Sequence, residues 1–389
     1  MSVTTPSGFV ASGTACGIKG PNELDLALIA TDDGLAVPAA AVFTTNLAAA
    51  APVLVSRNHL SATGGRAAGV ILNSGNANAA TGARGNSQAE RMCQLVADGI
   101  GCRPEEVLVC STGLIGIPLP IGAIEAGMAE LLRERAGNRG PRAAAAIMTT
   151  DTCPKQVAVT GERFTVGGMA KGAAMLAPRM ATMLAVLTTD AAVGPGPLQR
   201  ALTAAVARSF NLLTIDGATS TNDTVILLAS GRRGVEPDEA ELAEALWEAC
   251  SDLAGQMAAD AEGSTKVVRV RVTGAASSTD AARGARRIAE SQLVKCSFYG
   301  ADPYWGRIVS ELGSAGIAFD MERVSVSYSG ITVCTGGVEV TGYDAGALKN
   351  AMSRPSIEVV ADLGLGDGEG AVLTVDLTHG YIDENMRTS

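Results

Sequence analysis

Short hydrophobic runs bounded by Gly, Asp and Pro mark the first third of the chain. Runs of this length and setting are typical of buried strands. We predict strands at Leu26–Ile29, Ala39–Thr45, Val70–Leu72 and Val107–Cys110. The Asn/Gly/Ser-rich stretch that follows Val70–Leu72 predicts a tight loop with exposed amides.

Hydrophobic residues at helical spacing predict helices over Asn86–Ile100 and Glu239–Ala261. Polar residues alternate with Val along Lys266–Thr273, which indicates a half-buried strand. This mixture of elements predicts α/β or α+β layers. The composition of Gly274–Ser278 places a domain boundary near residue 275.

Composition restricts the classes of protein that the chain can represent. Its 389 residues predict two or three domains. The net charge of −10 argues against nucleic acid and against an anionic membrane surface as partners. No run of ~18 hydrophobic residues and no leader pattern is present. We therefore expect a cytoplasmic protein with no nucleic-acid or membrane partner.

The chain is poor in the residues that most metal sites and nucleophile–base pairs use. Its eight cysteines form no CxxC and are interpreted as buried free thiols, and it has only two histidines, so no metal site is predicted. GxSxG, HExxH and P-loop motifs are absent. We interpret Gly364–Gly370 as a glycine-rich turn and His379 as a solvent-facing residue after a strand.

An N-terminal threonine offers a different base, because its own α-amino group titrates near ~7.7 and can activate its hydroxyl. Cleavage would require a small residue before the threonine and a rigid strand after it. Ala181 and Thr182, followed by the hydrophobic Met183–Leu187, meet both requirements. On these residues alone, a threonine that merely opens a buried strand remains the alternative.

The string KGAAMLAPRMATML (Lys171–Leu184) resembles the self-processing motif of the ornithine acetyltransferase family, the bifunctional glutamate N-acetyltransferases/ornithine acetyltransferases of arginine biosynthesis. The resemblance covers nearly the whole chain. Further matching strings, in chain order, are Ile71–Gly82, Cys110–Gly116, Ala146–Lys155, Ile215–Thr224, Asp260–Lys266, Leu293–Lys295, Asp302–Arg307 and Asp376–Asn385.

The resemblance implies self-cleavage at Ala181–Thr182 into an α chain, residues 1–181, and a β chain, residues 182–389, assembled as an α2β2 heterotetramer. It implies an α/β fold: an N-terminal-nucleophile-like sandwich of stacked sheets flanked by helices. We assign residues 1–275 to this catalytic sandwich. Residues 276–389 form a smaller α/β domain whose tail returns to the active site.

The implied reaction is a ping-pong transfer. Thr182 takes the acetyl group from N-acetylornithine and passes it to glutamate. No cofactor is implied, although some members of the family accept acetyl-CoA as donor. Thr112 and Gly113 match the oxyanion-hole pair, whose donors stabilise developing negative charge. Taken alone, they would be an ordinary polar turn.

Substrate contacts are implied along the whole chain. Lys171 is suited to a substrate carboxylate and Glu262 to the side-chain ammonium of ornithine. Thr149 is favoured over Thr150 as a further contact. The implied substrate-binding residues are Thr149, Lys171, Thr182, Glu262, Asn385 and Ser389.

Three departures from the family pattern leave the acceptor open. Tyr304 stands where Asn is usual, Cys296 where Thr is usual, and the tail is one residue short, with Arg387 near a usual tyrosine. The alternatives are a related acetyltransferase with another acceptor, an aminopeptidase or amidase of the same fold that uses water, and a binding protein without activity.

Overall fold

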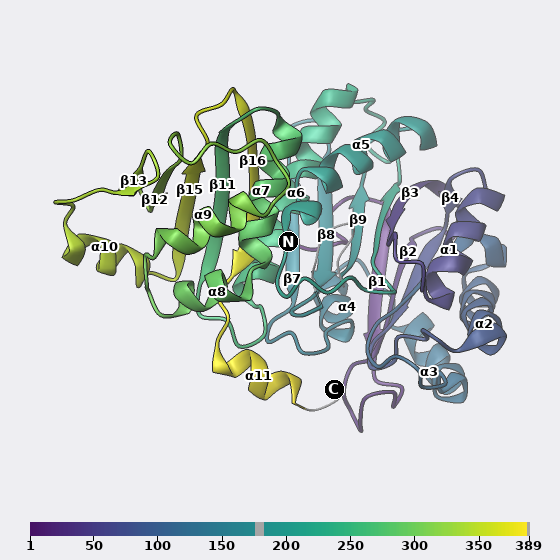
Figure 1. The fold of residues 1–389 in the computed structure, drawn as a ribbon. Helices are drawn as coiled ribbons and strands as arrows, with labels where there is room; N and C mark the ends of the chain where they lie inside the picture. Colours follow the sequence, from purple (N-terminus) through teal and green to yellow (C-terminus); the bar gives the residue numbers. More distant parts are fainter. Residues whose placement is uncertain (176–182, 387–389) are drawn as a thin grey trace. The chain divides into compact units, whose positions relative to one another are not determined.

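The computed structural model describes residues 1–175 and 183–386, which form two compact units (Figure 1). Unit 1 comprises Met1–Asn211 and Ala218–Met257, and unit 2 comprises Leu212–Gly217 and the described chain from Ala258 onward. Each unit builds its own sheets around its own hydrophobic core.

Two mixed sheets form the centre of unit 1. The first has the order β1-β2-β5-β6, with β1 Phe9–Thr14, β2 Leu26–Thr31, β5 Gly69–Asn73 and β6 Val107–Ser111. The second has the order β4-β3-β10-β9-β8-β7, with β4 Arg66–Ala67, β3 Val37–Phe43, β10 Thr224–Ala229, β9 Leu184–Thr189, β8 Thr165–Lys171 and β7 Lys155–Thr160. Strands β5 and β6 are parallel, as are β9 and β10, and the other pairs are antiparallel.

The two sheets of unit 1 share one core, to which Val70 of the first sheet and Val186 of the second both belong. Helix α4 (Gly140–Ala146) contributes buried alanines to this core. It packs so closely on β1 that a Cβ at Gly13 would lie 2.5 Å from the Arg142 carbonyl oxygen. The abundance of Gly and Ala in the sequence therefore permits close backbone packing.

Helices cover the outer faces of both sheets of unit 1. A second core joins α1, α2 and α3 to the first sheet, while α5 contacts β3 and β10, and Leu253 of α6 lies beside Gly168 of β8. This helix–sheet–sheet–helix arrangement confirms the predicted layered α/β fold. The helices are α1 Ala51–Ala62, α2 Gly82–Ile100, α3 Ile121–Arg133, α5 Pro195–Ala207 and α6 Glu239–Ala259, with short 3-10 turns at η1 Pro104–Glu106 and η2 Phe210–Leu212.

Unit 2 is built on one mixed sheet of order β14-β13-β12-β15-β11-β16. Its strands are β11 Val267–Ala275, β12 Ser325–Tyr328, β13 Ile331–Thr335, β14 Val338–Glu339, β15 Ser356–Asp362 and β16 Gly368–Val375. Its helices are α7 Ser278–Glu290, α8 Gln292–Tyr299, α9 Trp305–Gly313, α10 Ala345–Met352 and α11 His379–Asn385. Helix α7 packs on β11 and β16, where a Cβ at Gly370 would lie 2.5 Å from the Ala282 nitrogen.

The predicted domain boundary near residue 275 is wrong. Strand β11 lies inside the sheet of unit 2, parallel to β15 and antiparallel to β16, so the boundary falls between Met257 and Ala258. The small residues of Gly274–Ser278 end β11 and begin α7 with only Ala276 and Ser277 between them, so they form a tight connection rather than a linker, and Gly274 has φ +63°.

Two smaller predictions need similar correction. Helix α2 begins at Gly82, one turn before the predicted Asn86. The glycine-rich string from Gly364 does turn, but Gly368 and Gly370 already belong to β16.

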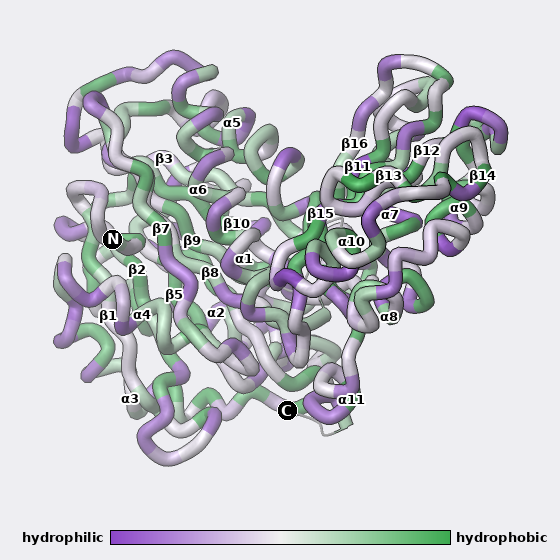
Figure 2. Tube along the Cα trace, turned by 90° about the vertical axis from the view of Figure 1, so that its left-hand side faces the viewer, coloured by the Kyte–Doolittle hydropathy of each residue, from purple (hydrophilic) through white to green (hydrophobic). Residues whose placement is uncertain are grey.

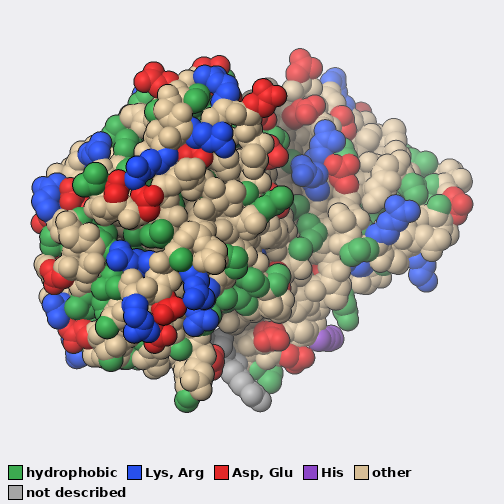
Figure 3. All heavy atoms as spheres, turned by 180° about the vertical axis from the view of Figure 1, so that it is seen from behind, with side chains coloured by type: hydrophobic (Ala, Val, Ile, Leu, Met, Phe, Trp, Pro, Cys, Tyr) green, Lys and Arg blue, Asp and Glu red, His purple; other side chains and the backbone are tan. Residues whose placement is uncertain are grey.

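The hydrophobic segments of the chain lie in the central strands of these layers (Figure 2). Strands β2, β5, β6, β9 and β10 are buried along their whole length. Basic and acidic side chains are intermixed on the face shown in Figure 3. Among residues 1–175 and 183–386, no helix is long and apolar enough to cross a membrane.

Candidate functional site

Strand ends gather polar residues at two sheet edges of unit 1. The carboxyl ends of β5 and β6 lie side by side, with Asn73 paired to Ser111. The amino ends of β9 and β10 also lie side by side, with Leu184 paired to Thr224. Lys171, the last residue of β8, pairs with Leu184. The loops at these ends carry most of the residues that were singled out from the sequence for unit 1.

Lys171 and Thr149, two predicted substrate contacts, lie together. The Lys171 side chain is buried, and its Nζ donates to Thr149 Oγ1 at 2.6 Å. Asp151 lies beside both, since the Thr149 N–H donates to its Oδ2 at 3.0 Å and Lys171 Nζ is 3.8 Å from the same oxygen. Lys155 Nζ and the Gly172 N–H donate to Asp151 Oδ1 at 2.6 and 2.7 Å. Two ammonium groups thus lie beside one buried carboxylate.

The charge of Asp151 is set by these neighbours. Burial alone would raise its pKa, but the ammonium groups of Lys171 and Lys155 and the hydrogen bonds from Lys155 and Gly172 outweigh burial and lower the pKa to about 2. Asp151 is therefore an anion at neutral pH.

Thr112 and Gly113 form a turn that packs on the loop after β5. The Thr112 N–H donates to the Asn73 carbonyl at 3.0 Å, and the Leu114 N–H donates to the Gly75 carbonyl at 3.4 Å. Gly113 has φ +128°, and a Cβ there would lie 2.3 Å from the Gly75 carbonyl carbon, so only glycine fits. Within the described chain, the Thr112 hydroxyl and the Gly113 N–H have no hydrogen-bond partner. Two adjacent donors are therefore available to a ligand oxygen.

Asn222 and Asp223, which precede β10, connect this turn to the start of β9. Asn222 Nδ2 donates to the Ser111 carbonyl at 2.9 Å, directly before Thr112. Asp223 Oδ1 accepts a hydrogen bond from the Met183 N–H at 3.0 Å, and burial raises the pKa of Asp223 well above its usual range. Two consecutive residues therefore connect the turn with Met183.

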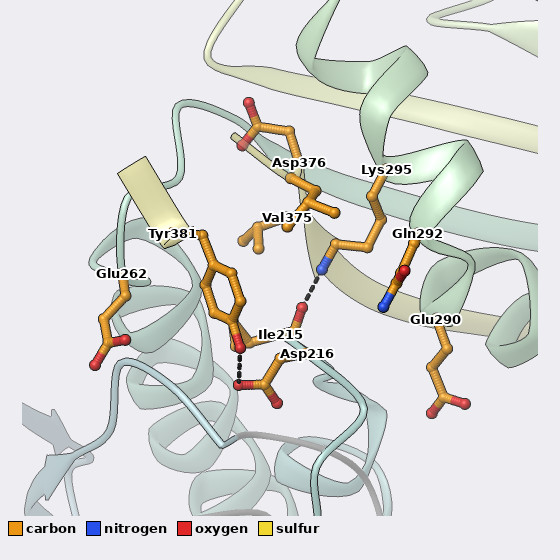
Figure 4. A pocket seen from close by; sticks show the side chains of 10 residues that line it. Ile215, Asp216, Glu262, Glu290, Gln292, Lys295, Val375, Asp376 and Tyr381 are labelled. Atoms are coloured by element: carbon orange, nitrogen blue, oxygen red, sulfur yellow. Dashed lines mark hydrogen bonds between the residues drawn. The ribbon is translucent and has the colours of Figure 1, made fainter. Parts of the chain in front are cut away.

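Glu262, a further predicted residue, lines a cavity in unit 2 (Figure 4), and the predicted Asn385 lies beside Glu262. Asn385 Nδ2 donates to Glu262 Oε2 at 2.8 Å, and the Tyr381 hydroxyl donates to Asp216 Oδ2 at 3.3 Å. Helix α11 is thus held by acidic side chains. The cavity is lined by Ile215, Asp216, Glu262, Glu290, Gln292, Lys295, Val375, Asp376, Leu377 and Tyr381.

Lys295 supplies a buried cation to this cavity. Its Nζ donates to the Ile215 carbonyl oxygen. Burial lowers the pKa of Lys295 to about 8, although Asp216 and Asp376 act in the opposite direction.

Three sequence predictions, Ala181, Thr182 and Ser389, lie outside the described residues, as does Arg387. Of the departures from the family pattern, Tyr304 is exposed beside Arg307, with the guanidinium 5.8 Å from its ring centre. Cys296 is exposed on α8. Neither residue lines the cavity of unit 2.

Cysteine and histidine positions were only partly predicted. All eight cysteines are free, but Cys153 and Cys296 are exposed, so the expectation of buried thiols is wrong for these two. His379 is exposed as expected, and His59 is buried, with its ring nitrogens 2.8 Å from the Val107 carbonyl and 2.9 Å from Glu90. The described residues contain no group of three His, Cys, Asp or Glu side chains that could hold a metal.

The sequence matches the ArgJ family over residues 10–388. The chain belongs to the ArgJ family. It is 49% identical over 395 residues to the arginine biosynthesis bifunctional protein ArgJ of Mycobacterium tuberculosis H37Rv, which covers all of this chain and 96% of that protein. The protein of the same name from Thermobifida fusca is 45% identical over 389 residues, all of both chains. The crystal structure of ornithine acetyltransferase from M. tuberculosis, in complex with ornithine, shares 46% identity, covers 46% of this chain and 94% of that chain, and has a TM-score of 0.43.

The candidate site of unit 1 and the cavity of unit 2 also contain residues to which the sequence assigned no role: Asp151, Lys155, Asn222 and Asp223 in unit 1, and Lys295 in unit 2. All five lie inside strings quoted for the resemblance. Their signal was a charged or amide side chain set among small and hydrophobic residues. That signal does not reveal which partner each side chain meets.

We expect Asp151→Asn to lose about 3 kcal/mol of unfolding free energy at neutral pH, because it removes the anion beside two buried ammonium groups. The folded pKa of about 2 lies below the ordinary value of 3.8. The stabilisation is therefore complete above that value and is lost as pH falls towards 2. Urea unfolding of wild type and Asp151→Asn along a pH series measures this stabilisation. The difference in unfolding free energy between the two proteins should shrink as pH falls from 3.8 towards 2.

Asp33→Asn is the matched control, because Asp33 is an exposed carboxylate paired with Arg232. It should change stability by less than about 1 kcal/mol. A difference between wild type and Asp151→Asn that stayed constant down to pH 2 would contradict the assigned role of the carboxylate.

Proposed function

We propose that this chain transfers an acetyl group from N2-acetylornithine to glutamate through an acetyl ester on Thr182, after cutting itself between Ala181 and Thr182. The observation that carries the proposal is the pair of available donors at Thr112 and Gly113, connected through Asn222 and Asp223 to the residue after Thr182. The substrate class follows from relatives named for arginine biosynthesis and from the ornithine bound to a 46% identical protein.

Self-cleavage creates the catalytic group. Thr182 Oγ attacks the Ala181 carbonyl carbon, its proton passes to the departing nitrogen, and an ester replaces the peptide bond. Water then hydrolyses this ester, giving a chain that ends at Ala181 and a free α-amino group on Thr182. With a pKa near ~7.7, this amine can accept a proton at neutral pH.

Acetyl transfer then proceeds in two balanced steps. The Thr182 amine takes the Oγ proton while Oγ bonds to the acetyl carbon, and the C–N bond breaks as the proton passes to the amine of departing ornithine. The α-amino group of glutamate then bonds to the acetyl carbon, the C–Oγ bond breaks, and the proton of the attacking amine passes through the Thr182 amine to Oγ, which gives N-acetylglutamate and restores the hydroxyl. In both steps the negative oxygen receives hydrogen bonds from the Thr112 hydroxyl and the Gly113 N–H, which typically lower a barrier by ~3 kcal/mol per donor.

The remaining predicted residues would position the amino acid. The ammonium of Lys171, with the Thr149 hydroxyl beside it, suits an α-carboxylate. Glu262, oriented by Asn385, suits the distal ammonium of ornithine. Ser389 is proposed as a further contact from the tail.

Every reacting group in this proposal belongs to the chain or its substrates, so no cofactor is required, and acetyl-CoA enters only as an alternative donor. We further propose that the two cleaved chains assemble as an α2β2 heterotetramer. Light scattering on the purified protein measures that mass directly.

We expect Thr182→Ala to abolish both cleavage and transfer, since it removes the hydroxyl that forms both esters. Thr182→Ser keeps a hydroxyl and should be cleaved and active. Intact mass spectrometry measures cleavage, and product masses from N-acetylornithine with glutamate measure transfer. Acetyl transfer by an uncut chain, or by Thr182→Ala, would exclude Thr182 as the nucleophile.

The same assay separates the alternatives. Acetate as the main product in the presence of glutamate would identify an amidase that uses water. Acetylation of a different amine in a panel of acceptors would identify a related enzyme of another pathway.

We expect Glu262→Gln to raise the KM for N-acetylornithine at least tenfold, because it removes a charge that would bind the distal ammonium. The KM for glutamate, which has no such ammonium, should change little. Initial rates with each substrate varied in turn measure both constants. Glu23→Gln, in a turn of unit 1, is the control. An equal rise in both KM values would contradict the assignment.

A further inference from the structure

We propose that Asn222 is a positioning residue that holds the turn of Thr112 and Gly113 in the geometry that an oxyanion requires. This inference rests on the proposed function, since it concerns the same turn. The Asn222 side chain is uncharged and buried, and its amide is hydrogen-bonded to the Thr221 hydroxyl and to the Ala77 and Ser111 carbonyls. Its effect on the reaction would therefore be transmitted entirely through the backbone.

Asn222 uses both protons of its amide on two separate loops. Its Nδ2 donates to the Ala77 carbonyl at 2.6 Å and to the Ser111 carbonyl at 2.9 Å. Ala77 lies in the loop after β5, and Ser111 is the last residue of β6. A single side chain therefore joins the end of β6, which leads into the turn, to the loop after β5, on which the turn packs.

The Ser111 contact fixes the peptide that leads into the turn. The carbonyl of this peptide accepts from Asn222 Nδ2, and its nitrogen, which belongs to Thr112, donates to the Asn73 carbonyl at 3.0 Å. A peptide unit is planar, so hydrogen bonds at both ends define its orientation. That orientation sets the direction in which the Thr112 side chain leaves the backbone.

The Ala77 contact acts on the other side of the turn. The Ala77 N–H donates to the Leu114 carbonyl at 2.9 Å, and Leu114 directly follows Gly113. Asn222 therefore holds the residue before the donor pair directly and the residue after it through Ala77. Both ends of the two-residue turn depend on this one amide.

The surroundings of Asn222 leave no simple substitute for it. The side chain is buried, and Thr221 Oγ1 donates to its Oδ1 at 2.6 Å. Two carbonyl acceptors on one side and a hydroxyl donor on the other orient the amide in one way. A shorter side chain would leave both carbonyls unpaired in the interior.

The catalytic consequence follows from the geometry that oxyanion stabilisation demands. Donors act only when they lie close to the position that the negative oxygen will occupy. A displacement of about 1 Å at such a site can slow a reaction about a hundredfold. Because Asn222 does not touch substrate in this proposal, its loss should reduce kcat by about that factor and leave KM nearly unchanged.

The test compares Asn222→Ala and Asn222→Asp with wild type, using the full self-cleaved protein, N-acetylornithine and glutamate. Asn222→Asp keeps the side-chain size but replaces the donor group with an acceptor facing two carbonyls, so it serves if the alanine variant does not fold. We expect both variants to lose kcat about a hundredfold. Hydrogen–deuterium exchange should speed up at the amides of Thr112 and Leu114.

Ser56→Ala is the matched control. Ser56 is also buried, and its Oγ donates at 2.7 Å to the Val109 carbonyl of the same strand, β6, two residues before Ser111. It should lower stability without changing kcat or the exchange of the turn. An equal loss of kcat in Ser56→Ala would show that general damage to β6, rather than positioning, explains the effect.

A double-mutant cycle with Thr112→Ala shows whether Asn222 acts through the turn. Once Thr112 is replaced, the further loss of kcat on removing Asn222 should be far smaller than the loss in wild type. If the losses of kcat in the two single variants simply multiply in the double variant, the proposal is overturned. It is also overturned if both Asn222 variants keep the kcat of wild type and its hydrogen–deuterium exchange in the turn. If wild type transferred no acetyl group, the proposed function would fail, and the exchange data alone would still decide whether Asn222 orders the turn.

Discussion

A buried carboxylate with two ammonium neighbours is the interaction on which the candidate site of unit 1 depends. Lys155 and Lys171 begin and end the antiparallel pair of β7 and β8, and both side chains are buried. Buried cations are tolerated only where a counter-charge and hydrogen bonds compensate for lost hydration. Asp151 supplies that charge and also accepts the Thr149 N–H. The requirement to neutralise two lysines therefore sets the position of Lys171 and of the threonine bonded to it.

The arrangement of the sheets explains why this site forms where it does. Each sheet of unit 1 contains one parallel pair, and the ends of these pairs place short loops side by side. Loops at such positions must satisfy their own backbone groups, because they are partly enclosed by the sheets. The amide of Asn222 meets part of that need at Ser111 and Ala77. The groups that remain unpaired in the described turn are the Thr112 hydroxyl and the Gly113 N–H, which are the donors that the proposed reaction uses.

Much of this organisation could be predicted from the sequence. Hydrophobic runs located the strands, and the quoted strings located Thr149 and Lys171, which do lie together. The boundary near residue 275 failed because glycine and alanine mark a tight connection as readily as a linker. The ion pair of Asp151 could not be derived, because its partner Lys171 lies beyond strand β7 in the sequence and meets it only through sheet pairing. Composition alone does not show which charges will be buried together.

The two buried aspartates of this site show how one residue type serves two electrostatic roles. Asp151 is held as an anion by its lysines, whereas burial raises the pKa of Asp223 more than the Met183 N–H, Ser220 and Lys171 lower it. Burial therefore disfavours the charged form of Asp223, although the Met183 N–H donates to its Oδ1. In the proposed reaction that difference would matter, because a second anion near the turn of Thr112 and Gly113 would oppose the charge that develops on the reacting oxygen. The lysine cluster therefore stabilises the charge of Asp151, whereas burial acts against a charge on Asp223, the residue after Asn222.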